Sequence, residues 1–150
     1  MLTIHKNRLP HWRIEGSYYA VTCHLRDGTL TEVERDLILE TVKKGHKTMY
    51  NLIAIQIMNN HVHLILQPIR GFSLSKIMKN IKGATAREIN LRRGVQGSLW
   101  MKDSYDRIIR NENELLEQVK YIYQNPLRAG IVERPELYKW WYAPDYENGD

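Results

Sequence analysis

The sequence has little cysteine and no long apolar run. Its 150 residues include one cysteine, Cys23, which excludes an internal disulfide and a cysteine-based zinc site and is typical of a small buried filler. No apolar stretch approaches the roughly 18 residues that cross a bilayer, and residues 1–6 lack the apolar segment of a secretory signal. We therefore expect a cytoplasmic protein without a membrane segment.

Acidic residues are the minority among the charged ones. Lys and Arg number 22 against 17 Asp and Glu, which gives a net charge of +5 and favours a polyanionic partner without proving one. The length and the 43% hydrophobic content suit one globular domain. We predict a basic N-terminal arm over residues 1–16, the domain over 17–142 and a polar C-terminal tail over 143–150.

Residue periodicity predicts an alternation of strands and helices. Asn59-Asn60 tolerates the geometry of a tight hairpin turn, and Thr31 with Glu34 is typical of a capping box. The predicted order is a strand over 17–25, a helix from 31 to 49, strands over 52–58 and 61–67, a helix opened by Ser73, a strand within 99–109 and a helix over 112–124. This order predicts an α+β fold with a mostly antiparallel sheet and packed helices.

Two histidines alternate on the second strand of the predicted hairpin, in the run His61-Val62-His63. Side chains of a strand alternate between its faces, so both imidazoles point toward one site. Val62, Leu64 and Leu66 are then buried under helices, and the histidine face is left for solvent or a ligand. Neutral imidazole is a common metal ligand, so the pattern indicates half of a metal site. The alternative is a half-exposed strand that binds no metal.

The helix over 112–124 carries a second candidate pair. Its apolar stripe consists of Leu115, Val119, Ile122 and Tyr123. At about 100° per residue, Tyr121 points away from that stripe, and Asn125 returns to nearly the same direction four residues later. We therefore predict that Tyr121 and Asn125 share one site and that Tyr123 is buried. An ordinary surface tyrosine and an ordinary helix end are the alternatives.

The histidine pair and the tyrosine pair complement each other chemically. A tyrosine hydroxyl is a poor nucleophile unless its target is activated, and a metal held by His61 and His63 can activate a phosphodiester. The carboxamide oxygen of Asn125 supplies a third ligand and leaves positions for phosphate oxygens and water. We expect Mg²⁺ or Mn²⁺, and two imidazoles suit Mn²⁺ better.

Two segments have the residue order and spacing of known signature motifs. The segments are 58–63, with the histidine pair, and 121–132, with Tyr121 and Asn125. They resemble the motifs of the single-tyrosine HUH transposases of the IS200-like superfamily, and the REP-associated tyrosine transposases in particular. Further similarity at residues 9–12, 98–100 and 105–110 extends the resemblance over residues 8–142.

The resemblance implies a metal-dependent endonuclease and strand transferase that acts on single-stranded DNA carrying palindromic hairpins. It implies that His61 and His63 bind the metal and that Tyr121 attacks the phosphorus, which forms a 5′-phosphotyrosine link. Asn125 stands where the REP-associated branch has asparagine. The implied fold is an antiparallel sheet of the ferredoxin or RNA-recognition kind. We expect a monomer associated with the nucleoid, with a dimer that exchanges tyrosine helices as the alternative.

Basic and aromatic side chains are candidate DNA contacts. Lys and Arg bind phosphates, and Trp stacks on unpaired bases. The candidates are Arg8, Trp12, Arg13, Lys76, Lys79, Lys82, Arg87, Trp100 and Arg107, with Arg92 and Arg93 in the same group. A solvated surface is the alternative for the helix lysines. Outside the paired histidines, His24 shows no partner pattern. The alternative function is a domesticated, structure-specific nucleic-acid-binding protein without transposition activity.

Overall fold

A five-stranded antiparallel sheet forms the centre of the computed structural model, which describes residues 2–4 and 16–148. The strands, in the spatial order β5-β2-β4-β3-β6, are β2 (Tyr18–His24), β3 (Tyr50–Ile57), β4 (His61–Pro68), β5 (Tyr105–Ile109) and β6 (Trp141–Tyr142). The chain runs strand, helix, strand, strand, helix, strand through the four longer strands, which is the ferredoxin-like arrangement. The predicted α+β fold is thereby confirmed.

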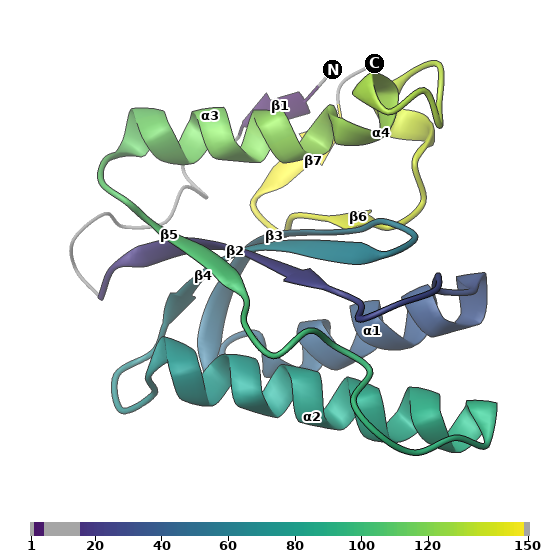
Figure 1. Ribbon diagram of the computed structural model, residues 1–150. Coiled ribbons are helices and arrows are strands. Elements are labelled where there is room, and N and C mark those ends of the chain that lie inside the picture. The colour runs from purple at the N-terminus through teal and green to yellow at the C-terminus, as the bar shows by residue number, and fades with distance from the viewer. Residues whose placement is uncertain (1, 5–15, 149–150) are drawn as a thin grey trace.

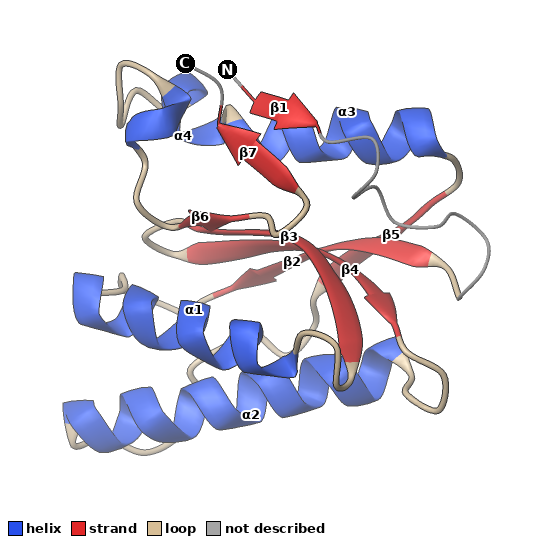
Figure 2. Ribbon diagram, turned by 180° about the vertical axis from the view of Figure 1, so that it is seen from behind, coloured by secondary structure: helices blue, strands red, loops and turns tan. Residues whose placement is uncertain are grey.

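Three long helices cover the two faces of this sheet (Figures 1 and 2). Helices α1 (Glu32–Gly45) and α2 (Leu74–Arg93) pack on one face, and α3 (Glu112–Tyr123) packs on the other. The short helices α4 (Asn125–Arg128) and η2 (Pro135–Leu137) follow α3. Strands β1 (Leu2–Ile4) and β7 (Tyr146–Asn148) pair antiparallel on the α3 side. The sequence missed β1, β6 and β7 because two or three residues are too few to show a period.

Side-chain caps set the helix starts that the sequence predicted. The Oγ1 of Thr31 accepts from the Glu34 amide at 3.2 Å, and Glu34 Oε1 accepts from the Thr31 amide at 2.9 Å. Ser73 caps α2 through a 3.1 Å bond from the Lys76 amide. Helix α2 ends at Gly94, whose φ of 67° is a left-handed conformation that glycine adopts readily. The predicted end of α1 at residue 49 is wrong, because His46 has already left the helix with a ψ of 130°.

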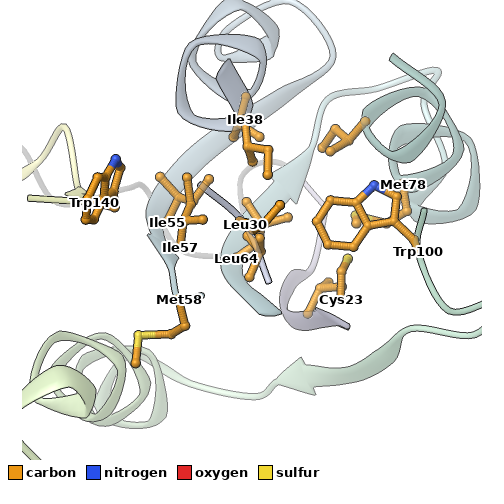
Figure 3. Close-up of a cluster of buried hydrophobic side chains, with 14 of the residues drawn as sticks. Cys23, Leu30, Ile38, Ile55, Ile57, Met58, Leu64, Met78, Trp100 and Trp140 are labelled. Carbon is orange, nitrogen blue, oxygen red and sulfur yellow. The ribbon is translucent and has the colours of Figure 1, made fainter. Parts of the chain in front are cut away.

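The larger core lies between the sheet and helices α1 and α2 (Figure 3). It contains Val62, Leu64 and Leu66, as the alternation along β4 predicts, and the buried thiol of Cys23. Trp100 also belongs to this core, where its indole N–H donates to Thr85 Oγ1 at 3.0 Å. The predicted strand within 99–109 begins only at Tyr105, since Leu99 and Trp100 are buried in the core and residues 101–104 form the loop that leads to the strand.

A second core lies between the sheet and α3. Its members come from both layers and include Tyr18, Ile53, Ile65, Ile109, Leu115, Val119 and Ile122. The expectation that the histidine face of β4 is left to solvent or a ligand is therefore wrong for most of its length. Only the His61 and His63 end of that face stays partly exposed. The fold thus places the histidines at the rim of a covered surface.

Candidate metal and nucleophile site

The paired histidines of β4 lie against the neighbouring strand β2 on the α3 side of the sheet. In the antiparallel register Thr22 is opposite His63 and His24 is opposite His61. The ring centroids of His61 and His63 are 4.9 Å apart, so the two imidazoles share one face as predicted. His24 stacks on His61 with centroids 5.4 Å apart. His24 is exposed, and its stacking on His61 is a contact that the sequence pattern did not indicate.

Asn125 reaches His63 from the start of α4. Its Nδ2 lies 3.3 Å from His63 Nε2, and its Oδ1 lies 3.5 Å from an Nη2 of Arg128. Because a guanidinium only donates, the amide atom that faces it is the oxygen, and the amide nitrogen therefore faces the imidazole. His63 Nε2 then accepts, and its Nδ1–H donates to Thr22 Oγ1 at 3.1 Å. The Nε2 lone pair of His63 is thus directed at Asn125.

His61 is held in the same tautomer by its neighbour in the chain. Its Nδ1 lies 2.7 Å from Asn60 Oδ1, which accepts the Nδ1–H and leaves the lone pair on Nε2. A metal-ligating histidine usually donates its other ring N–H to an oxygen, and both histidines here do so. Thr22 and Asn60 therefore orient the two imidazoles in the form that a metal requires.

Burial lowers the pKa of both imidazoles and so favours their neutral form. Burial in the first place, and the charges of His61, His24 and Arg128 in addition, lower the pKa of His63 to about 4. Burial and then the charge of His24 also lower the pKa of His61. A neutral imidazole has the lone pair that a metal ligand needs, so the histidine pair is in its metal-binding protonation state.

The donor set at this corner fits a small divalent cation with open positions. Over residues 2–4 and 16–148, no three His, Cys, Asp or Glu side chains form a cluster that could hold a metal. A site here consequently needs the carboxamide of Asn125 beside His61 and His63. Two imidazoles and one amide oxygen leave coordination positions for phosphate oxygens and water, as Mg²⁺ and Mn²⁺ prefer.

Tyr121 lies on the exposed side of α3, and Arg128 joins it to Asn125. The side chain of Tyr121 is 58% exposed, whereas Tyr123 is buried at 3%, as the helical periodicity predicts. The guanidinium carbon of Arg128 lies 3.9 Å from the centroid of the Tyr121 ring. An Nη2 of Arg128 also donates to the Tyr121 carbonyl at 2.5 Å. Arg128 thus places a positive charge between the tyrosine ring and the asparagine.

The candidate DNA contacts of α2 and β5 have different environments. Lys76, Lys79 and Arg87 are exposed, and Lys79 lines a groove of about 810 Å³ between α2 and residues 98–106. Lys82 donates to the carbonyls of Met101 and Lys102, at 3.0 and 3.3 Å. Arg107 pairs with Glu114 at 3.1 Å. The α2 residues therefore lie on the face of the sheet opposite to His61, whereas Arg107, on the edge strand β5, pairs with Glu114 of α3 on the same side of the sheet as His61 (Figure 1).

Two of the predicted DNA contacts have structural roles instead. Trp100 is 6% exposed and its N–H is bonded to Thr85, so the expectation that it stacks on an unpaired base is wrong. Arg93 forms a two-point bridge with Glu34, at 2.6 and 2.8 Å, which occupies its guanidinium. The candidates Arg8, Trp12 and Arg13 lie outside the described residues. No helix within the described ranges is long and apolar enough to span a membrane.

Sequence reasoning missed the residues that orient the site. Thr22 and Asn60 fix the histidine tautomers, and Arg128 contacts both Tyr121 and Asn125. Arg128 follows Tyr121 by seven residues, which is two helical turns, and this spacing could have suggested it. Thr22 could not be found in this way, because only the pairing of β2 with β4 brings it to His63.

Comparison with known proteins assigns the class to which this fold and site belong. The model of the family described as IS200-like transposases matches residues 17–125, so the chain belongs to that family. The chain is also 24% identical over 132 residues to a protein of Haemophilus influenzae named a REP-associated tyrosine transposase, covering 79% of this chain and 75% of that protein.

Two solved structures share the fold. One is a REP-associated tyrosine transposase bound to a REP hairpin, with a TM-score of 0.67 and 20% identity over 95% of this chain and 91% of that one. The other is a transposase from Deinococcus radiodurans, with a TM-score of 0.55 and 19% identity over 76% of this chain and 94% of that one. The predicted family and fold are thereby confirmed.

Proposed function

We propose that the protein nicks and rejoins single-stranded DNA next to hairpins, with Tyr121 as the nucleophile and a divalent cation held by His61, His63 and Asn125. The family assignment supports transposase chemistry, and a structural relative was solved with a REP hairpin. A monomer is proposed, since Asn125 reaches His63 within one chain.

The contact between Asn125 and His63 is the observation that carries this proposal. The two side chains come from segments 62 residues apart in the sequence, and they meet with the Nε2 lone pair of His63 directed at the amide. Thr22 and Asn60 hold both imidazoles in the tautomer that carries the lone pair on Nε2. A helix packed on the sheet only through apolar contacts would not require this polar alignment at its C-terminal end.

Each residue then has a defined chemical task. A bound Mg²⁺ or Mn²⁺ supplies Lewis-acid polarisation of the phosphodiester and charge neutralisation. The phenol of Tyr121 gives its proton to solvent and its oxygen forms a bond to phosphorus, while the bond from phosphorus to the 3′ oxygen breaks and that oxygen takes up a proton from solvent to become a 3′-OH. Arg128 stands over the Tyr121 ring, where its charge favours the approach of an anionic strand. The reverse reaction with another 3′-OH rejoins the DNA.

A denaturing gel tests this proposal directly. Wild-type protein is incubated with Mn²⁺ and single strands that contain palindromic hairpins, and the covalent protein–DNA adduct is quantified. Tyr121→Phe should abolish the adduct while hairpin binding, measured by gel shift, stays intact. Tyr123→Phe is the matched control two residues away, because the Tyr123 hydroxyl is buried without a hydrogen-bond partner in the described structure.

Two outcomes would contradict the proposal. Loss of the adduct in Tyr123→Phe and not in Tyr121→Phe would show that Tyr123, and not Tyr121, is the nucleophile. Hairpin binding by the wild-type protein without any adduct, with both Mg²⁺ and Mn²⁺, would instead favour a DNA-binding protein that no longer cleaves.

A further inference from the structure

Gln56 is a buried carboxamide without a partner, and it lies next to the proposed site. Its side chain is fully buried, and neither its Oε1 nor its Nε2 has a hydrogen-bond partner among the described residues. In the sheet register Gln56 on β3 is opposite His63 on β4. Residues opposite each other in an antiparallel pair have Cβ atoms about 4.5–5.5 Å apart on the same face. The orphaned amide therefore stands directly beside the His63 imidazole.

The neighbours of Gln56 place it beneath the C-terminal end of α3, the helix that carries Tyr121 and Tyr123. Its other neighbour in the register is Trp141 on β6, and the Trp141 ring contacts Tyr123 with centroids 5.0 Å apart. Asn125 stands over His63 on one side of Gln56, and Tyr123 stands over Trp141 on the other. Gln56 is thus covered by the segment that carries Asn125.

An unpaired buried amide is costly, and the cost is removed if a partner arrives during function. Leaving one buried donor or acceptor without a hydrogen bond is unfavourable, and Gln56 has an unpaired donor, Nε2, and an unpaired acceptor, Oε1. A methionine or leucine at this position would avoid this cost. The presence of an unpaired glutamine in the core of the sheet consequently points to a bond that is made in another state of the site.

Metal binding creates the need for such a bond at Asn125. In the structure the Asn125 Nδ2 donates to His63 Nε2, and that lone pair cannot serve a cation and an N–H at once. When the imidazole nitrogen and the Asn125 oxygen turn to a cation, the Asn125 NH₂ group loses its acceptor. Arg128, which also contacts Asn125, only donates and cannot replace it. Gln56 Oε1 is an unpaired acceptor one register position away.

We propose that Gln56 is a positioning residue of the metal site, because its Oε1 accepts the Asn125 N–H and so turns the Asn125 oxygen toward the cation. This inference rests on the proposed function, since it requires that His63 and Asn125 bind the metal. It adds a residue of β3 to a site otherwise built from β4, α3 and the start of α4. Gln56 itself does not contact the reacting atoms.

Mn²⁺ affinity, measured by calorimetric titration without DNA, tests the inference. Gln56→Met keeps the size and shape of the side chain and removes the acceptor. We expect this variant to bind Mn²⁺ about 10-fold more weakly, the lower end of the effect of losing a residue that orients a metal ligand. Its thermal unfolding without metal should occur at the same or a higher temperature, because no hydrogen bond of the metal-free protein is lost.

A double variant separates this role from general structural damage. If Gln56 acts through Asn125, then Gln56→Met should add no further loss of Mn²⁺ affinity to Asn125→Ala. Losses that multiply in the double variant would overturn the inference, as would a Gln56→Met protein that binds Mn²⁺ like the wild type while Asn125→Ala binds weakly. A wild-type protein that binds no Mn²⁺ would overturn the proposed metal site and this inference together.

Discussion

The two faces of the sheet differ in how their buried polar atoms are paired. On the side of α1 and α2, the Tyr50 hydroxyl donates to the Val42 carbonyl at 2.6 Å, and the Trp100 indole donates to Thr85. On the α3 side, Gln56, Tyr123 and Tyr146 each bury a polar atom with no hydrogen-bond partner among the described residues. Burial of its hydroxyl raises the pKa of Tyr146 to about 12. Among the described residues, these buried polar groups on the α1 and α2 face form hydrogen bonds within the protein, whereas those on the α3 face do not.

This difference separates the part of the fold that supplies stability from the part that carries chemistry. The α1 and α2 face has the larger apolar core and closes its polar groups with internal bonds. The α3 face has the smaller core, and its rim holds the histidine pair and the tyrosine helix. Unpaired buried groups reduce stability and are expected at functional sites, where a ligand completes their bonds. Strand β4 belongs to both faces, so single substitutions along it test the separation.

The largest expected effect is that of His63→Ala, on the α3 face of β4. Loss of a ligand removes metal assistance that contributes several kcal/mol, so adduct formation should fall by about 10³-fold or more. The free energy of unfolding should fall less than in a core truncation, because His63 is partly exposed at the rim and its removal costs chiefly the bonds to Thr22 and Asn125. His24→Ala is the matched control: it removes the exposed histidine that stacks on His61 and should retain most of the adduct. Equal losses of the adduct in both variants would contradict the proposed ligands, because His24 would then matter as much as His63.

A second large effect is expected from Leu64→Ala, one residue further along β4. Leu64 is 1% exposed in the core under α1 and α2 (Figure 3), and truncation of such a residue costs about 2–5 kcal/mol. Urea unfolding measures this loss, and the Mn²⁺ affinity of the folded variant should match that of the wild type. If Leu64→Ala weakened Mn²⁺ binding as much as His63→Ala does, the two faces would not be separable.

The sequence predicts these two faces of β4 because alternation along a strand is a local property. The same holds for the stripe of α3, for the caps of α1 and α2, and for the hairpin at Asn59-Asn60, each of which depends on neighbours in the chain. The opposite directions of Tyr121 and Tyr123 were predictable for that reason. What these two tyrosines do in catalysis stays a prediction.

Contacts between distant segments could not be predicted in this way. Trp100 looked like a free stacking surface, but a bridge to Leu25 and a bond to Thr85 place it in the core. Arg93 looked like a phosphate contact, and its partner Glu34 lies 59 residues away. Gln56 gave no local signal, since only the pairing of β3 with β4 brings it to His63. Register and tertiary packing, not periodicity, determine these roles.

The smallest expected effect is a pH-dependent loss of stability when the ion pair between Glu34 of α1 and Arg93 of α2 is removed. Glu34 accepts two bonds from Arg93 and caps the Thr31 amide, and the hydrogen bond from Arg93 is the main reason that the pKa of Glu34 is lowered. A carboxylate whose pKa is lower in the folded state stabilises the fold above its unfolded pKa of ~4.3, and this stability is lost as the pH falls through the folded value.

Glu34→Gln keeps an oxygen for the Thr31 amide but removes the charge. It should therefore cost about 1–2 kcal/mol at pH 7, a figure at the low end for charged hydrogen bonds because Arg93 is partly exposed. Urea unfolding of both proteins at pH 7 and then below pH ~4 should show the difference shrinking in acid, as the wild-type carboxylate takes up its proton. A difference that stays constant with pH would mean that the bridge between α1 and α2 contributes through its shape alone and not through its charge.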